Sequence, residues 1–165
     1  MVHTDKHLAQ LHAHNGKVEF LSFQLGGLEY GVEFRKVKEL RSLKSLERFA
    51  ADGSIIKGVA LSRGVIIPLV DMRSAFPAQP RGRSAATDVI VLELSTCVMG
   101  MVVDGVTDVV RIRAEQISMI PGSGHESDFS YLIGLGEADG RRLILVDIDR
   151  LMSIQGETGL AQAVA

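Results

Sequence analysis

The sequence predicts a mainly β fold made of two small β-barrels of about five short strands each, with short helices and a helix near the C-terminus. Two observations lead to this prediction. Short apolar runs alternate with Gly, Asp and Asn turn signals along most of the chain, which is typical of hairpins. One pattern of residues also occurs twice at a constant spacing, which indicates an internal duplication.

Composition argues against several classes of function. The 165 residues include 18 basic and 20 acidic side chains, so no overall positive field would attract nucleic acid. Six Phe, two Tyr and no Trp leave few rings for stacking on bases. The single cysteine, Cys97, is typical of a reducing compartment. Because the chain has neither a signal-peptide core nor a run of 18 apolar residues, we expect a cytoplasmic protein that does not insert into a membrane.

The first part of the chain predicts a tail, a hairpin and a third strand. Residues 1–16 are polar and contain four of the five histidines, and we expect a disordered tail there. Val18–Leu25 alternates between apolar and polar residues, and the chain returns as Leu28–Phe34 after Gly26-Gly27. Arg35–Leu40 is a further expected strand, followed by a long loop.

A second hairpin completes the first half. Gly58–Leu61 and Val65–Val70 are apolar runs that flank the turn Ser62-Arg63-Gly64. Pro68 lies inside the second run, and because proline cannot donate to a ladder, this strand is expected to be an edge or bulged strand. We therefore expect the first barrel over about residues 17–78.

The second half follows a linker. Residues 77–86 contain two prolines, a glycine and small polar residues without periodicity. The second barrel is expected over about residues 87–154, and residues 155–165 form a C-terminal tail. Its expected elements are hairpin strands at 87–94 and 97–103, a strand at 106–112, paired strands at 131–136 and 143–146, and a last helix capped by Asp147.

An internal repeat relates the two halves. Residues Gly31, Val37, Glu39 and Leu40 recur 69 positions later as Gly100, Val106, Asp108 and Val109, and Gly58 and Asp71 recur with the same mutual spacing as Gly134 and Asp147. Two unrelated hairpins can resemble each other, but fixed offsets over several positions favour duplication. Neither half alone is large enough to be comfortably stable, so the barrels should share an apolar interface, whose groove is the natural binding site.

No set of residues in the sequence predicts catalysis. His125 has serines and a glutamate beside it, but sequence neighbours rarely form a triad because their side chains point in different directions. Asp71, Asp104 and Asp147 each follow an apolar run, where an aspartate can cap the next turn. Phosphate-loop, zinc-protease, CxxC and dinucleotide motifs are absent from the sequence. We therefore expect no enzyme activity, no cofactor and no metal, and a function in binding.

The stretch Lys57–Phe76, KGVALSRGVIIPLVDMRSAF, resembles the signature of the CheW family, which typically reads G-V-x-N-L-R-G-x-x-x-P-[VIL]-V-D-[LM]-R-x-x-F. Leu61-Ser62 stands where the family has Asn-Leu, and the resemblance extends from about Glu19 to Met152. The matching residues are Gly58, Val59, Arg63, Gly64, Pro68, Val70, Asp71, Met72, Arg73 and Phe76. The resemblance implies two five-stranded SH3-like barrels packed together over residues 17–154.

The resemblance also implies the function of a non-catalytic adaptor. CheW proteins couple transmembrane chemoreceptors, the methyl-accepting chemotaxis proteins, to the histidine kinase CheA, and are recruited to membrane receptor arrays. Carried over by position, the receptor-facing groove would comprise Val37, Glu39, Gly58, Arg63, Ile66, Gly100 and Val109. The kinase-facing surface would comprise Arg41, Leu43, Leu46 and Lys57. Among these, the two glycines would let a receptor helix approach the backbone closely.

Three alternatives are open at this stage. A CheW-like adaptor can also serve a related chemosensory pathway, for twitching or surface motility or for biofilm formation. A small β-barrel can bind nucleic acid, although the charge and the aromatic content oppose this function. An enzyme whose site is assembled from distant residues would need a pocket of converging ionisable groups.

Overall fold

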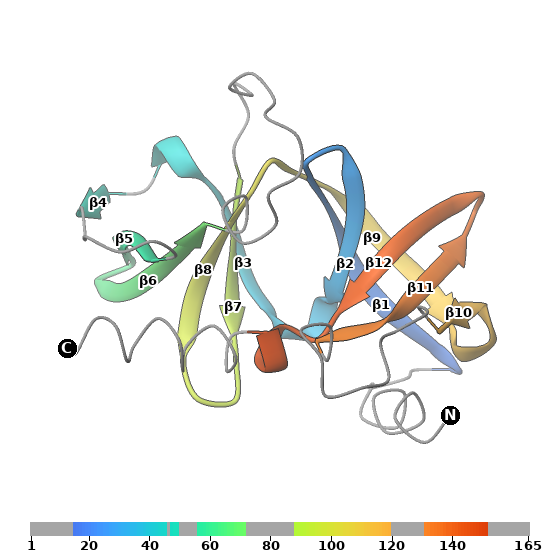
Figure 1. Cartoon of the computed structure of the whole chain (residues 1–165). Helices are drawn as coiled ribbons and strands as arrows, with labels where there is room; N and C mark the ends of the chain where they lie inside the picture. Colours follow the sequence, from blue (N-terminus) through green and yellow to red (C-terminus); the bar gives the residue numbers. More distant parts are fainter. Residues whose placement is uncertain (1–14, 46, 50–55, 72–87, 120–130, 152–165) are drawn as a thin grey trace.

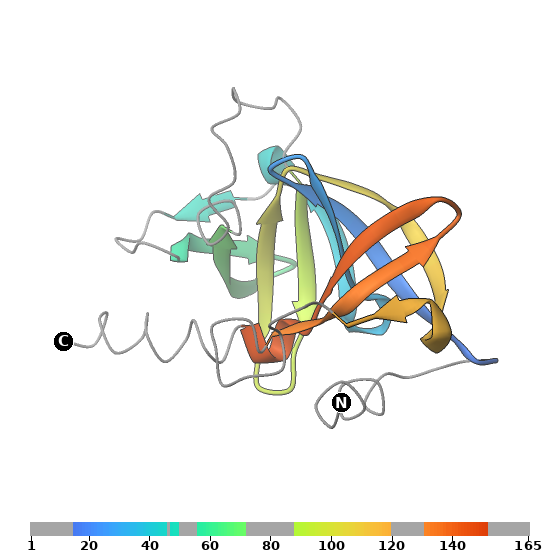
Figure 2. The ribbon, with the colours of Figure 1, turned by 45° about the vertical axis from the view of Figure 1, so that its right-hand side comes forward.

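The computed structural model describes residues 15–45, 47–49, 56–71, 88–119 and 131–151. Two curled six-stranded sheets lie side by side (Figures 1 and 2), which confirms the predicted mainly β fold. Sheet A has the strand order β10-β11-β12-β2-β1-β9 and sheet B the order β4-β5-β6-β8-β7-β3. No helix among the described residues is long and apolar enough to cross a membrane.

The strands are short, as the spacing of turn signals indicates. Those of sheet A are β1 (Lys17–Leu25), β2 (Leu28–Glu33), β9 (Gly105–Arg113), β10 (Ile117–Ser118), β11 (Leu132–Ala138) and β12 (Arg141–Val146). Those of sheet B are β3 (Val37–Ser42), β4 (Glu47–Phe49), β5 (Ile56–Ser62), β6 (Val65–Asp71), β7 (Asp88–Glu93) and β8 (Val98–Val103). Short 3₁₀ turns occur at η1 (Phe34–Lys36), η2 (Leu43–Ser45) and η3 (Ala114–Gln116).

Each sheet combines strands from both halves of the chain. The β1–β2 hairpin joins β9 to β12 in sheet A, whereas the β7–β8 hairpin joins β3 to β6 in sheet B. Parallel pairs, β2 with β12 and β8 with β6, hold each hairpin to the other half. This arrangement differs from two consecutive barrels over about residues 17–78 and 87–154, because each half contributes its first hairpin to the sheet of the other.

The strand register confirms the internal repeat. Gly31 is paired with Leu145 in sheet A, and its counterpart Gly100 is paired with Leu69 in sheet B. The antiparallel ladders agree as well, because the pairing of β9 with β1 repeats the pairing of β3 with β7. The register shift next to Val37 in β3 recurs next to its counterpart Val106 in β9. The two halves therefore fold in the same way and exchange equivalent hairpins.

Pro68 marks a difference between the two sheets. Ile144, at the equivalent place in sheet A, is already paired with Tyr30, whereas the ladder between β6 and β8 begins one residue later, at Leu69. Because proline has no amide hydrogen to donate, the ladder of sheet B is displaced by one residue and ends at Asp71, with three pairs as in sheet A. The edge-strand prediction is thus wrong for the second part of β6, which lies between β5 and β8. It is correct for the first part, from Val65 to Pro68, where β5 is the paired neighbour.

Three apolar clusters hold the described part of the chain together. One lies within the curl of sheet A and includes Phe20, Ile112 and Leu145. Another lies within sheet B and includes Ile67, Leu69 and Val89. The largest takes residues from both sheets and fills the space between them with Leu21, Phe23, Tyr30, Val32, Ile90, Leu92, Met99, Met101, Val146, Ile148 and others. This shared cluster confirms the predicted apolar interface.

A helical turn at residues 148–151 closes the described part of the chain. The Asp147 carboxylate accepts a hydrogen bond of 3.2 Å from the backbone N–H of Arg150, as predicted for a capping residue. Lys36 Nζ lies 2.8 Å from Asp149 Oδ2, and Ser95 donates both its backbone N–H and its hydroxyl to Asp149 Oδ1. The turn therefore connects the β2–β3 link to the β7–β8 turn, between the two sheets (Figure 1).

Several predicted features lie outside the described residues. They are most of the N-terminal tail, the turn expected after Asp71, the linker at 77–86, the loop around His125 and the C-terminal tail.

Candidate functional site

The structure brings together Glu39 and Arg63, two of the predicted receptor-facing residues. Glu39 lies on β3, and Arg63 occupies the β5–β6 turn with a φ of 50°. Arg63 Nη2 lies 3.5 Å from Glu39 Oε1, and Arg41 Nη1 lies 3.1 Å from the same oxygen. The Arg63 side chain is 80% exposed, and an ion pair so exposed contributes little to stability. The guanidinium of Arg63 is therefore accessible to a carboxylate of a partner.

Exposed apolar side chains lie next to this pair in the sequence. Val65 and Ile66 follow the turn on β6 and are 57% and 67% exposed, and Leu40 follows Glu39 on β3 and is 46% exposed. Val37 is half-buried and packs against the cluster between the sheets. Because successive residues of a strand point to opposite faces, Leu40 and Glu39 lie on opposite faces of β3, and Val65 and Ile66 on opposite faces of β6. This part of sheet B therefore exposes both apolar and charged side chains, the two kinds of group that protein interfaces use.

Gly100 does not line an open groove, contrary to the sequence-based prediction. It is buried on β8, where an added Cβ would lie 2.7 Å from Leu69 Cδ2 and 3.0 Å from Val89 Cγ1. The missing side chain makes room for the core of sheet B and not for a helix of a partner. Gly58 lies on β5, opposite Leu69 of β6.

The remaining predicted residues are spread over both sheets. Val109 lies on β9 of sheet A, at the position equivalent to Leu40 of sheet B, and is 40% exposed. Of the kinase-facing set, Arg41 lies on β3 and Leu43 lies in η2, packed against the core of sheet B. Lys57 is a residue of strand β5, and Leu46 lies outside the described residues.

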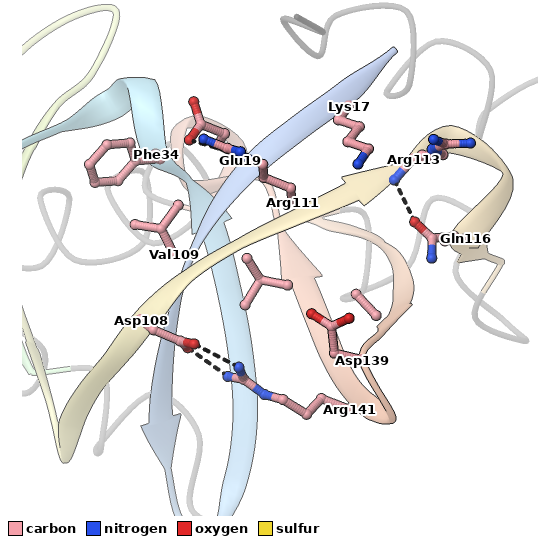
Figure 3. Close-up of a pocket in the computed structure, with 12 residues that line it drawn as sticks. Lys17, Glu19, Phe34, Asp108, Val109, Arg111, Arg113, Gln116, Asp139 and Arg141 are labelled. Atoms are coloured by element: carbon pink, nitrogen blue, oxygen red, sulfur yellow. Dashed lines mark hydrogen bonds and ion pairs between the residues drawn. The ribbon is translucent and has the colours of Figure 1, made fainter. Parts of the chain in front are cut away.

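A second charged cluster, which sequence reasoning missed, occupies the equivalent position in sheet A. Arg141 of β12 donates hydrogen bonds of 2.8 Å to both carboxylate oxygens of Asp108 on β9, the counterpart of Glu39 (Figure 3). Its Nη2 also bonds to Ser22 Oγ at 3.1 Å and to Glu29. These bonds hold the pKa values of Asp108 and Glu29 below their usual range and raise the pKa of Arg141.

The two equivalent clusters differ in how firmly they are held. Asp108 is bound through both oxygens by an arginine whose side chain is 30% exposed, whereas Glu39 meets an arginine that is 80% exposed at a longer distance. Bidentate pairs have a more fixed geometry than single contacts and bind more strongly. The cluster of sheet A is therefore a structural clamp, and that of sheet B is the one open to a partner.

A pocket of about 540 Å³ lies on sheet A beside the Arg141 clamp (Figure 3). It is lined by Lys17, Glu19, Phe34, Asp108, Val109, Val110, Arg111, Arg113, Gln116, Ala138, Asp139 and Arg141. General acid catalysis at neutral pH needs a carboxyl group with a raised pKa, but the pKa of Asp108 is lowered. Among the described residues, no three His, Cys, Asp or Glu side chains are placed to hold a metal ion.

Comparisons with known proteins agree in one family. The family model of the CheW-like domain matches residues 19–155. Chemotaxis protein CheW of Klebsiella aerogenes is 44% identical over 147 residues, which are 89% of this chain and 88% of that protein. Protein FrzA of Myxococcus xanthus is 25% identical over 146 residues, 87% of this chain and 91% of that protein. The crystal structure of the scaffolding protein TtCheW from Thermoanaerobacter tengcongensis matches with a TM-score of 0.71 and 25% identity, covering 84% of this chain and 94% of that one.

Proposed function

Because the chain belongs to the CheW family, we propose that it is a non-catalytic adaptor that couples chemoreceptors to the histidine kinase CheA in chemotaxis signalling. The observation that carries this proposal is the 44% identity to a chemotaxis protein CheW along nearly the whole of both chains. The accessible Arg63 in the signature turn supports it. In this role the protein works on the cytoplasmic side of the membrane, recruited to receptor arrays.

The receptor-facing surface of this adaptor centres on Arg63 and Glu39. Val65 and Ile66, two and three residues after Arg63, expose apolar side chains on β6, so a receptor helix with both apolar and acidic residues fits the chemistry of this region. Val37, Gly58 and Val109 complete the proposed set. Gly100 is not part of it, because its place is in the core.

The kinase-facing surface lies on the same sheet. It is formed by Arg41, Leu43, Leu46 and Lys57, which belong to β3, to the segment after it and to β5. We expect each of the two surfaces to bury about 1,200 Å² or less and to bind its partner weakly on its own. Their combined strength comes from many copies held together in an array.

Size-exclusion chromatography of the chain with a CheA regulatory domain and a receptor cytoplasmic fragment tests the proposal. The wild-type chain should elute with both partners, and Arg63→Ala should weaken both associations while the far-ultraviolet circular dichroism stays unchanged. Arg142→Ala is the matched control, because this arginine is 74% exposed on sheet A and pairs with Glu137. Failure of the wild-type chain to bind either partner, or unchanged binding by Arg63→Ala, would count against the proposal.

A further inference from the structure

The outer face of the β1–β9 ladder is rich in cations. On β9, Val109, Arg111 and Arg113 alternate with the buried Val110 and Ile112, so they point away from the core. Across the ladder, Lys17 is paired with Arg113, and Glu19 with Arg111. This face therefore presents three cations and one carboxylate, on a chain whose formal net charge is −2.

The charges on this face are only partly compensated. Arg111 Nε lies 3.6 Å from Glu19 Oε2, and because both side chains are exposed, at 70% and 45%, this pair is weak. Lys17 and Arg113 form no ion pair with any residue that the structure describes. Arg141, the fourth cation of the pocket, is already held by Asp108 and Glu29. At least two cations thus remain available to a ligand.

The cations lie along a concave surface that also has an apolar end. The pocket of about 540 Å³ includes Phe34 and Val109, which are 38% and 40% exposed, together with Arg111 and Arg113. Figure 3 shows Phe34 and Val109 at one side and Arg113 at the other. Val109 and Arg113 are four residues apart on one strand, which corresponds to about 13 Å. A ligand that reaches both ends has the length of about five residues of extended peptide.

We propose that this pocket binds a short extended segment of a partner protein, with one apolar side chain and two carboxylates at alternate positions. The apolar side chain packs against Phe34 and Val109, and the carboxylates meet Arg111 and the Lys17–Arg113 pair. Exposed charge pairs between proteins mainly steer association and set specificity. The exposed cations of this pocket should therefore select acidic segments.

The carboxylates that line the pocket favour an acidic peptide over a continuous polyanion. Asp139 and Glu19 also line it (Figure 3), and their carboxylates would repel a continuous polyanion such as a nucleic acid or polyphosphate. The pocket shares Val109 with the proposed receptor-facing set, but its cations do not belong to that set, and the isolated chain should bind the segment without kinase or receptor.

Fluorescence anisotropy with a fluorescein-labelled pentapeptide, Leu-Ser-Glu-Ser-Glu, measures this binding directly. We expect saturable binding to the wild-type chain that weakens as salt is added. The matched peptide Leu-Ser-Gln-Ser-Gln should bind at least tenfold more weakly. The double variant Lys17→Ala/Arg113→Ala should also lose at least tenfold in affinity, and circular dichroism verifies that it is folded.

Two control variants separate this site from its surroundings. Arg142→Ala removes an exposed arginine outside the pocket, and Arg63→Ala removes the guanidinium of the proposed adaptor surface. Both should bind the acidic peptide as the wild type does, so a failure of the adaptor proposal would leave this result unchanged. Equal binding of the two peptides, wild-type affinity in the double variant, or binding of phosphatidylserine vesicles or inorganic phosphate in place of the peptide would overturn the proposal.

Discussion

Replacing Arg141 by alanine should lower the free energy of unfolding by about 2 kcal/mol. The substitution removes bonds to Asp108, Glu29 and Ser22, which come from three different strands. Hydrogen bonds to charged groups contribute about 1.5–3 kcal/mol each when shielded from water. Because Asp108 is half exposed, water replaces most of the contribution of its bonds to the free energy of unfolding. Ser22 is fully buried and Glu29 is 22% exposed, so the contribution of their bonds is lost.

Urea unfolding followed by far-ultraviolet circular dichroism measures this change. With an m-value of about 2 kcal/mol/M, the midpoint of Arg141→Ala should fall by about 1 M with the m-value unchanged. Arg63→Ala is the control from the equivalent cluster of the other sheet, and its exposed pair should contribute below about 0.5 kcal/mol. Equal losses in the two variants would refute the conclusion that only the Arg141 cluster is a clamp.

The clamp should also make the wild type more sensitive to acid than the variant. Arg141 lowers the pKa values of Asp108 and Glu29 from their ordinary 3.8 and 4.5, so the stabilisation is complete above those values. It is lost as the pH falls through the lower values of the folded state. The difference between wild type and Arg141→Ala should therefore be constant near neutral pH and narrow below about pH 4.

Two further predictions concern single contacts. Gly100→Asp should leave little folded protein, because its Cβ would lie 2.7 Å from Leu69 and its carboxylate would be buried. The control Gly105→Ala has no atom within 4 Å of its Cβ and should unfold near the wild-type temperature. A stably folded Gly100→Asp variant would contradict the assignment of Gly100 to the core. Asp104→Ala should lower the free energy of unfolding by about 1 kcal/mol, because its carboxylate accepts a 2.8 Å hydrogen bond from the Gly26 amide, and an unchanged urea midpoint would show that this bond is unimportant.

The internal repeat can be recognised in the sequence because both copies need a glycine at the same place in the core. A Cβ at Gly31 would lie 2.8 Å from Leu145 Cδ2, and one at Gly100 would lie 2.7 Å from Leu69 Cδ2. Both copies therefore need glycine opposite leucine in a parallel ladder. The exchange of hairpins leaves no such trace, because a hairpin has the same apolar residues whichever half it joins.

The candidate site was less accessible to sequence reasoning. Arg63 and Glu39 were found through the family resemblance, and the structure places them together. Arg141 was missed because its partners are distant in sequence and share no spacing with it. Gly100 was assigned to the receptor-facing groove through the family resemblance. A missing side chain suits a close helix as well as a packed leucine, and only the neighbours of the glycine distinguish the two.

Because of the exchange of hairpins, neither half of the chain contains all the strands of one sheet. A polypeptide split between β6 and β7 would leave β1–β2 without β9 and β12, and β7–β8 without β3 and β6. Each fragment alone would expose the apolar faces and open ladders that its counterpart covers. Mixed in equal amounts, the two fragments should reconstitute the native fold without a covalent link, in a reaction whose yield rises with concentration.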